Sequence, residues 1–186
     1  MRGFTRAGPM LLAAVSLAIW VPAWAAAPAP GDIPPDELGI GIDGQAVRVS
    51  DFRGRVLITT FWASWCGPCV RELELLERLQ RVAGRDRVVV VGVNWNDSAA
   101  RYQLIRQRLR GLSLTLTRDD SGRVGERYAV RVIPRMFIVD QDGKLAYSHT
   151  GYDPESSIDS ILIEVNQLLQ HPPVSLMPSS SGHGGD

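Results

Sequence analysis

The stretch from residue 56 to residue 72 constrains the fold more than any other part of the sequence. Residues 56–62 are apolar or threonine on both faces, which predicts a buried strand covered by helices. This strand leads to Cys66-Gly67-Pro68-Cys69, and a helical pattern follows directly. Pro68 suits the first turn of a helix, because its missing N–H needs no partner there and its fixed φ is helical. The sequence therefore predicts a strand, a corner and a helix, with Cys66 at the helix N-terminus.

A cysteine at the start of a helix is placed for nucleophilic chemistry. Unpaired backbone N–H groups and the positive end of the helix dipole stabilise a thiolate at this position. Such surroundings lower the pKa of a thiol from ~8.5 toward ~7 or below. The thiolate of Cys66 would attack a disulfide, and Cys69, one turn further along, would resolve the mixed disulfide. The pair therefore predicts a two-electron thiol–disulfide centre.

Other roles for the two cysteines fit the sequence less well. A structural disulfide across this short loop would restrict the unfolded chain by only ~2 kcal/mol. A zinc site needs two further ligands, and the only histidines of the chain are His149, His171 and His183. Binding of Cu(I) by the two soft thiolates remains an alternative, as in a metallochaperone. We expect no resident metal ion and no cofactor besides the redox-active disulfide.

Two sequence motifs resemble those of a known family. The run Phe61-Trp62-Ala63-Ser64-Trp65-Cys66-Gly67-Pro68-Cys69 resembles a thioredoxin active site. With Glu72 three residues after the second cysteine, it resembles the TlpA/ResA group of extracytoplasmic thioredoxin-like proteins. The resemblance extends from about residue 39 to residue 170.

The expected fold belongs to the α/β class. The pattern predicts the order hairpin, β, α, β, α, β, α, β, β, α, with parallel crossovers and an antiparallel edge. The resemblance implies a thioredoxin fold with an N-terminal β-hairpin extension, a central helix–strand insertion and a mixed sheet flanked by helices. Expected strands are residues 39–49 as a hairpin, 56–62, 88–93, 112–117, 136–139 and 145–150. Expected helices are residues 67–82 with Leu75, Leu76, Leu79 and Val82 in the core, a helix capped at 96–98 and ending near 109, then 124–128 and 158–169.

Glu72 is the third candidate catalytic residue. Three positions after Cys69 it shares that residue's helix face, so it lies beside Cys69 rather than Cys66. It is either a solvated carboxylate like Glu74, or a proton acceptor and donor for the thiols with its pKa raised by partial burial. The resemblance favours the second role. Thioredoxins carry a buried aspartate six positions before the first cysteine, where Thr60 stands here, so Glu72 is the nearest group left to move protons.

The resemblance also suggests which residues contact a partner protein. In the thioredoxin fold a cis proline faces the cysteines, and Val132-Ile133-Pro134 before an apolar strand matches this position. The expected partner-binding residues are Trp65, Gly67, Pro68, Ile133 and Pro134. Trp65 is expected to be an exposed contact surface and Trp62 to pack beneath the site, while Trp95 fits either role.

The ends of the chain suggest export. Arg2 and Arg6 precede an apolar segment at residues 10–21 and a small-residue pattern at 23–27, which predicts a secretory signal over residues 1–27. An uncleaved N-terminal anchor is the alternative, and either one places the domain outside the cytoplasm. Proline-rich residues 28–38 predict an extended linker, residues 39–170 the thioredoxin-like domain and residues 171–186 a disordered tail.

The predicted function is reduction of disulfides in partner proteins outside the cytoplasm. A balanced charge with dispersed arginines argues against nucleic acid as a partner. The resemblance implies a membrane electron-transfer protein as reductant, and cytochrome c maturation or copper-centre assembly as the pathway. We expect a monomer, with a possible membrane tether through the N-terminus. A disulfide-forming oxidase or isomerase of the same fold is the first alternative, and the Cu(I) metallochaperone is the second.

Overall fold

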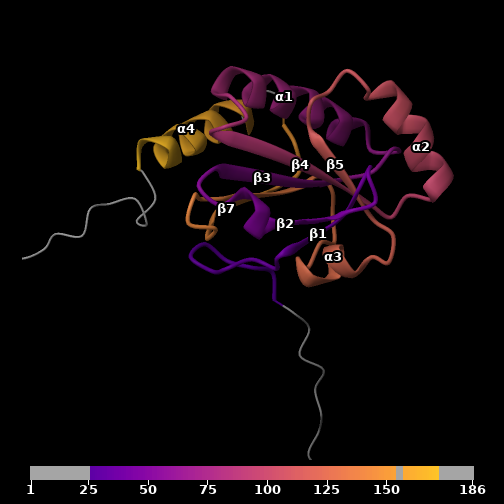
Figure 1. The fold of residues 1–186 in the computed structure, drawn as a ribbon, viewed down its shortest axis with the longest axis horizontal. Coiled ribbons are helices and arrows are strands. Elements are labelled where there is room, and N and C mark those ends of the chain that lie inside the picture. The colour runs from indigo at the N-terminus through magenta and orange to yellow at the C-terminus, as the bar shows by residue number, and fades with distance from the viewer. Residues whose placement is uncertain (1–25, 154–156, 172–186) are drawn as a thin grey trace, which may run out of the picture.

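A mixed sheet lies at the centre of the structure, a computed structural model that describes residues 26–153 and 157–171. Its seven strands lie in the order β2-β1-β5-β4-β3-β6-β7 (Figure 1). Strands β3, β4 and β5 are parallel, and the remaining pairs are antiparallel. The strands are β1 (Glu37–Gly41), β2 (Ala46–Arg48), β3 (Val56–Trp62), β4 (Val88–Trp95), β5 (Thr115–Asp119), β6 (Arg135–Val139) and β7 (Leu145–Thr150).

Helices cover both faces of the sheet. They are α1 (Gly67–Ala83), α2 (Ala99–Arg108), α3 (Arg123–Arg127) and α4 (Ser157–Gln170), and a 3-10 turn η1 spans Val49–Phe52. Helices α1 and α4 lie side by side over one face, and α3 lies on the other (Figure 1). Alternate residues of β3 belong to different cores: Ile58 packs in the core beneath α1 and α4, and Leu57 in the core on the α3 side. This two-sided burial is the reason for the continuous apolar run.

The predicted order of elements is confirmed. The structure has a thioredoxin-like fold, with the β1–β2 hairpin before β3 and the additional helix–strand pair between α1 and β6. Gly84 ends α1 with a φ of 88°, and its N–H donates to the carbonyl of Gln80. Strand β5 begins at Thr115, three residues later than expected.

Two expectations about burial and boundaries need correction. Val82 was expected in the core but is 88% exposed, and Leu75, also expected there, is only half-buried, because the buried positions of α1 run through Leu73, Leu76 and Leu79. Residues 28–38 were expected to form an extended linker before the domain. Instead, Gly31 and Asp32 exchange backbone hydrogen bonds of 2.8 Å with Leu145, and β1 begins at Glu37. The folded domain therefore starts before residue 39. The predicted signal at 1–27 lies almost wholly outside the described residues, as does the predicted tail.

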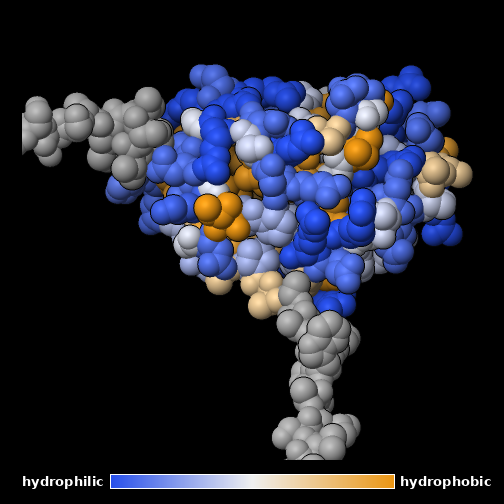
Figure 2. All heavy atoms as spheres, turned by 60° about the horizontal axis from the view of Figure 1, so that its bottom comes forward, coloured by the Kyte–Doolittle hydropathy of each residue, from blue (hydrophilic) through white to orange (hydrophobic). Residues whose placement is uncertain are grey.

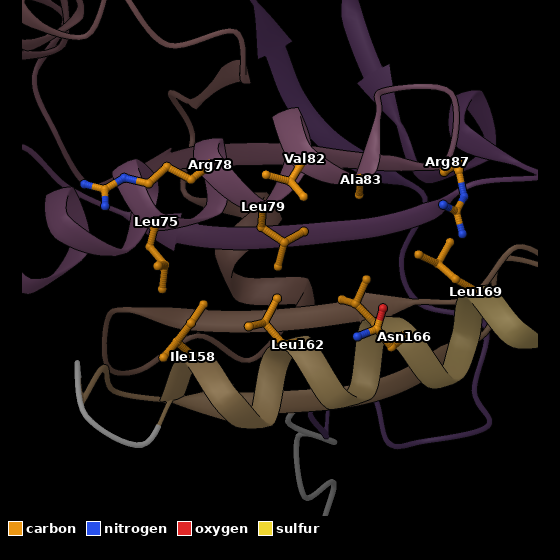
Figure 3. A pocket seen from close by; sticks show the side chains of 11 residues that line it. Leu75, Arg78, Leu79, Val82, Ala83, Arg87, Ile158, Leu162, Asn166 and Leu169 are labelled. Carbon is orange, nitrogen blue, oxygen red and sulfur yellow. The ribbon is translucent and has the colours of Figure 1, made fainter.

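One face of the surface is seen in Figure 2, and an apolar groove lies between helices α1 and α4. The face in Figure 2 is largely hydrophilic, with apolar side chains in small separate patches. A groove of about 440 Å³ runs between α4 and the C-terminal half of α1, lined mainly by leucine, isoleucine and valine (Figure 3). It begins at Leu75, more than two helical turns beyond Cys66. Within the described part of the chain, no helix combines the length and the apolar character that crossing a membrane requires.

Candidate active site

The two cysteines lie at the junction of β3 and α1. Cys66 is the N-cap of α1, and its Sγ accepts a hydrogen bond of 3.3 Å from the backbone N–H of Cys69. The two side chains are joined as a disulfide. Cys66 is 7% exposed and Cys69 is fully buried. Cys66 is therefore the sulfur that a partner can reach, and a backbone N–H is already directed at it.

The residues around the disulfide divide into a buried support and an exposed rim. Trp62 is completely buried beneath the site and Trp65 is 55% exposed, as expected for both. Gly67 and Pro68 are exposed in the first turn of α1. Trp95, for which the sequence allowed either a contact surface or a core position, is half-buried and packs against the core on the α3 side.

Glu72 is buried rather than solvated. Only 1% of its surface is exposed, and its Oε2 accepts a hydrogen bond of 2.5 Å from the hydroxyl of Thr60. Burial raises the pKa of Glu72 to about 7, although the Thr60 hydroxyl pulls it down by stabilising the carboxylate. The side chain can therefore hold or release a proton near neutral pH. Thr60 occupies the position at which the resemblance leads one to expect an aspartate. Its hydroxyl contacts Glu72, whose carboxyl group takes the place of that aspartate.

The segment before β6 reaches the same edge of the sheet. The peptide bond between Ile133 and Pro134 is cis, as predicted. Arg135 pairs with Phe61 in the antiparallel ladder of β6 and β3, so Pro134 lies level with the end of β3. Ile133 is half-buried and packs against both cores, whereas Pro134 is buried. The sheet register thus brings this segment to the end of β3 from which the active-site loop departs.

Asp97 is a site residue that the sequence analysis missed. Its carboxylate accepts hydrogen bonds from the backbone N–H of Ser64 at 2.7 Å, the Ser64 hydroxyl at 2.9 Å and the side-chain amide of Asn94 at 2.8 Å. The sequence interpretation assigned residues 96–98 to capping α2, and only Ser98 does so, accepting from the N–H of Arg101. Asp97 instead fixes the loop that precedes Cys66. No local signal reveals this contact, because it joins residues 33 positions apart.

Among residues 26–153 and 157–171, no three histidine, cysteine, aspartate or glutamate side chains cluster as metal ligands. His149 lies on β7 and contacts Glu164 of α4, with 2.7 Å between Nε2 and Oε2. The polar and reactive groups present at the start of α1 are the two sulfurs, the buried carboxyl of Glu72 and the backbone N–H groups of the helix.

Comparison with known proteins gives one consistent family. A model of the Redoxin family matches residues 29–162. The thiol-disulfide oxidoreductase ResA of Geobacillus thermodenitrificans is 28% identical over 144 residues, which cover 76% of this chain and 82% of the relative. A crystal structure from Chlorobium tepidum, assigned to the thiol:disulfide interchange protein DsbE, is 29% identical with a TM-score of 0.67, covering 77% of this chain and 99% of that one. The exposed lipoprotein thioredoxin Etrx1 of Streptococcus pneumoniae is 31% identical with a TM-score of 0.57, covering 72% and 99%.

Proposed function

Because the chain belongs to the Redoxin family, we propose that it reduces disulfides in partner proteins outside the cytoplasm. The chain is a thiol–disulfide oxidoreductase, and the proposal concerns its direction, its partners and its compartment. One observation most supports the exchange chemistry on which the proposal rests. The helix that places Cys66 at its N-terminus also carries the buried Glu72, whose pKa near 7 suits proton exchange with a thiol.

The proposed reaction starts from the Cys66–Cys69 dithiol. The thiolate of Cys66 attacks one sulfur of the partner disulfide, which forms a mixed disulfide and releases the other partner sulfur as a thiolate that takes up a proton. Cys69 then loses its proton to Glu72 and attacks Sγ of Cys66. The partner's second sulfur leaves as a thiolate and takes up the proton that Glu72 holds. Two electrons and two protons have passed to the partner, and the Cys66–Cys69 disulfide has formed.

We assign partner binding to the exposed residues beside Cys66 and to the segment that contains the cis proline. Trp65, Gly67 and Pro68 offer accessible surface beside Cys66, and the backbone at Ile133 and Pro134 would align the partner chain. Exposed Trp65 suits this role, because large aromatic side chains supply much contact area at little conformational cost. Each of these contacts is part of the proposal.

The compartment and the pathway follow from the relatives and the N-terminal sequence. Relatives are named ResA and DsbE, and one similar structure is an exposed lipoprotein. We place the chain outside the cytoplasm, exported or tethered through residues 1–27, with a membrane electron-transfer protein as its reductant. Cytochrome c maturation and copper-centre assembly are the pathways that suit a reductant in this compartment. The Gly67-Pro68 pair between the cysteines resembles reducing thioredoxins and favours reduction over disulfide formation.

Trapping tests the exchange mechanism. The variant Cys69→Ser cannot resolve the mixed disulfide, so extracts of exported proteins should yield adducts through Cys66 that dithiothreitol releases. The double variant Cys66→Ser with Cys69→Ser is the matched control and should trap nothing. Equal trapping by both variants, or none by either, would contradict attack by Cys66. Binding of one Cu(I) per reduced chain, lost in Cys66→Ser, would instead support the metallochaperone.

A further inference from the structure

A second groove lies between α2 and the active-site loop that leads to the disulfide. It has a volume of about 340 Å³ and is lined by Ser64 and Trp65 of the active-site loop and by Arg101, Leu104, Ile105 and Arg108 of α2. The loop residues immediately precede Cys66 in the chain. A polypeptide joined to Cys66 therefore has this groove within reach of the residues next to its own cysteine.

The two walls of the groove are tied together. Ser64 on one wall donates two hydrogen bonds to Asp97, and the next residue, Ser98, caps the N-terminus of α2 on the other wall. The distances of 2.7 and 2.9 Å to a carboxylate are those of strong, charge-assisted hydrogen bonds. The groove is therefore fixed relative to the disulfide.

One side of α2 presents an apolar side chain, Leu104, to solvent beside Trp65, at the edge of the part of the helix that packs on the core. Residues 101, 104, 105 and 108 follow the spacing of a single helix face. Leu104 is 59% exposed, Ile105 is half-buried and Trp65 is 55% exposed. The buried residue of α2 is Tyr102, which packs in the core together with Ile105 one turn further on, whereas Leu104 lies about 200° around the helix axis from Tyr102. Packing of the domain thus does not explain Leu104, and an apolar side chain from outside would gain by covering it together with Trp65.

The ends of this apolar strip carry positive charge. Arg101 and Arg108 are exposed one at each end. In the part of the chain that the structure describes, neither guanidinium group has an acidic partner, whereas Arg118, Arg81 and Arg127 each have one. A partner with carboxylates on both sides of an apolar side chain would complement this arrangement in shape and in charge.

We infer that the Trp65–α2 groove selects the partner: it takes a polypeptide segment that carries an apolar side chain flanked by acidic residues, close in sequence to the target disulfide. This inference rests on the proposed function, since it names the substrate class of the same site. Trp65 and Leu104 hold the apolar side chain, and Arg101 and Arg108 bind the flanking carboxylates.

Short synthetic peptides test the inference with the full chain. Each peptide is a disulfide-linked homodimer with one cysteine and, nearby, Glu-Leu-Glu, Lys-Leu-Lys or Glu-Ser-Glu. The pre-reduced protein is mixed with each peptide, and the second-order rate constant of peptide reduction is followed by mass spectrometry after acid quenching. We expect the Glu-Leu-Glu peptide to react about tenfold faster than the Lys-Leu-Lys peptide, with a ratio that shrinks as salt screens the charges.

Variants locate the preference. Reversing both charges in Arg101→Glu with Arg108→Glu should invert the ratio between acidic and basic peptides, whereas Arg110→Glu, an exposed charge outside this groove, should leave it unchanged. Leu104→Ser should abolish the preference for leucine over serine, and Ile163→Ser, which removes an equally exposed side chain from α4, should not. Because each result is a ratio between two peptides, a general loss of folded protein does not alter it.

The outcomes separate the inference from the proposed function. Equal rate constants for all peptides, or equal effects of Arg110→Glu and the groove variants, would overturn the groove while reduction of peptides still supports the proposed function. Failure of the reduced wild-type protein to reduce any of the peptides would overturn both.

Discussion

At the scale of single residues, the proposed proton chemistry rests on Glu72 and its contact with Thr60. A buried carboxyl group is costly in its charged form, which raises the pKa of Glu72 to about 7. The Thr60 hydroxyl donates to Oε2 at 2.5 Å, so the charged form is not left without a partner. Burial and this hydrogen bond together support the proposed role of Glu72, which is to take a proton from the thiol of Cys69 near neutral pH and to return it afterwards.

Replacing Glu72 should alter how stability depends on pH. In the oxidised protein the pKa of Glu72 lies near 7, above the 4.5 of an unfolded chain, so the folded state favours the protonated carboxyl. The contribution of this protonated carboxyl to the free energy of unfolding is complete below pH 4.5 and is lost as pH rises through 7. Between pH 4.5 and 8, the free energy of unfolding of the wild type should fall by about 3 kcal/mol relative to that of Glu72→Gln. Urea unfolding at the two pH values measures this difference.

The matched control is Glu74→Gln, which removes an exposed carboxylate from the same helix. The free energy of unfolding of Glu74→Gln should depend on pH as that of the wild type does. If Glu72→Gln and Glu74→Gln behave alike, the buried-carboxyl account is wrong. The rate of peptide reduction by Glu72→Gln should also lose its rise through pH 7, because the proton acceptor of Cys69 is absent.

At the scale of elements, the active-site loop depends on a contact between distant segments. The loop joins β3 to α1, and Asp97 after β4 accepts both Ser64 hydrogen bonds together with one from Asn94. A loop held at its middle leaves Cys66 little freedom. This preorganisation matters for exchange, because the attacking sulfur must align with the disulfide.

Removing the Asp97 carboxylate should destabilise the protein and slow its chemistry. Asp97→Ala leaves the partly buried Ser64 N–H without an acceptor, which should lower the free energy of unfolding by about 2 kcal/mol. Asp86→Ala, at an exposed site, should change stability by less than about 0.5 kcal/mol. Urea unfolding of the oxidised proteins gives both values. Equal stabilities for the two variants would show that the loop does not need Asp97.

At the scale of the whole molecule, the sequence predicted most of the fold and the centre of the site. Apolar runs such as β3 and β4 are local signals of buried strands. The spacing of Cys66 and Cys69, with Pro68 between them and a helical pattern after them, is a local signal of thiol–disulfide chemistry. Burial of Glu72 was only one of two alternatives, because helix spacing places it near Cys69 without saying what covers that face.

Long-range contacts account for what the sequence could not predict. Asp97 and Ser64 are hydrogen-bonded across 33 positions, and the docking of Gly31 on Leu145 spans most of the domain. Val82 was misplaced because helical periodicity alone does not fix the width of the buried face. The groove beside Trp65 likewise arises only when α2 and the active-site loop come together.

The reduction potential of the Cys66–Cys69 pair tests the central claim most directly, since it decides the direction of electron flow. Equilibration of the protein with defined thiol buffers, followed by counting of free thiols, gives the value. A reductant of partner proteins predicts a potential near or below that of thioredoxin, ~−270 mV. A potential approaching ~−120 mV would mark an oxidant and contradict the proposed direction.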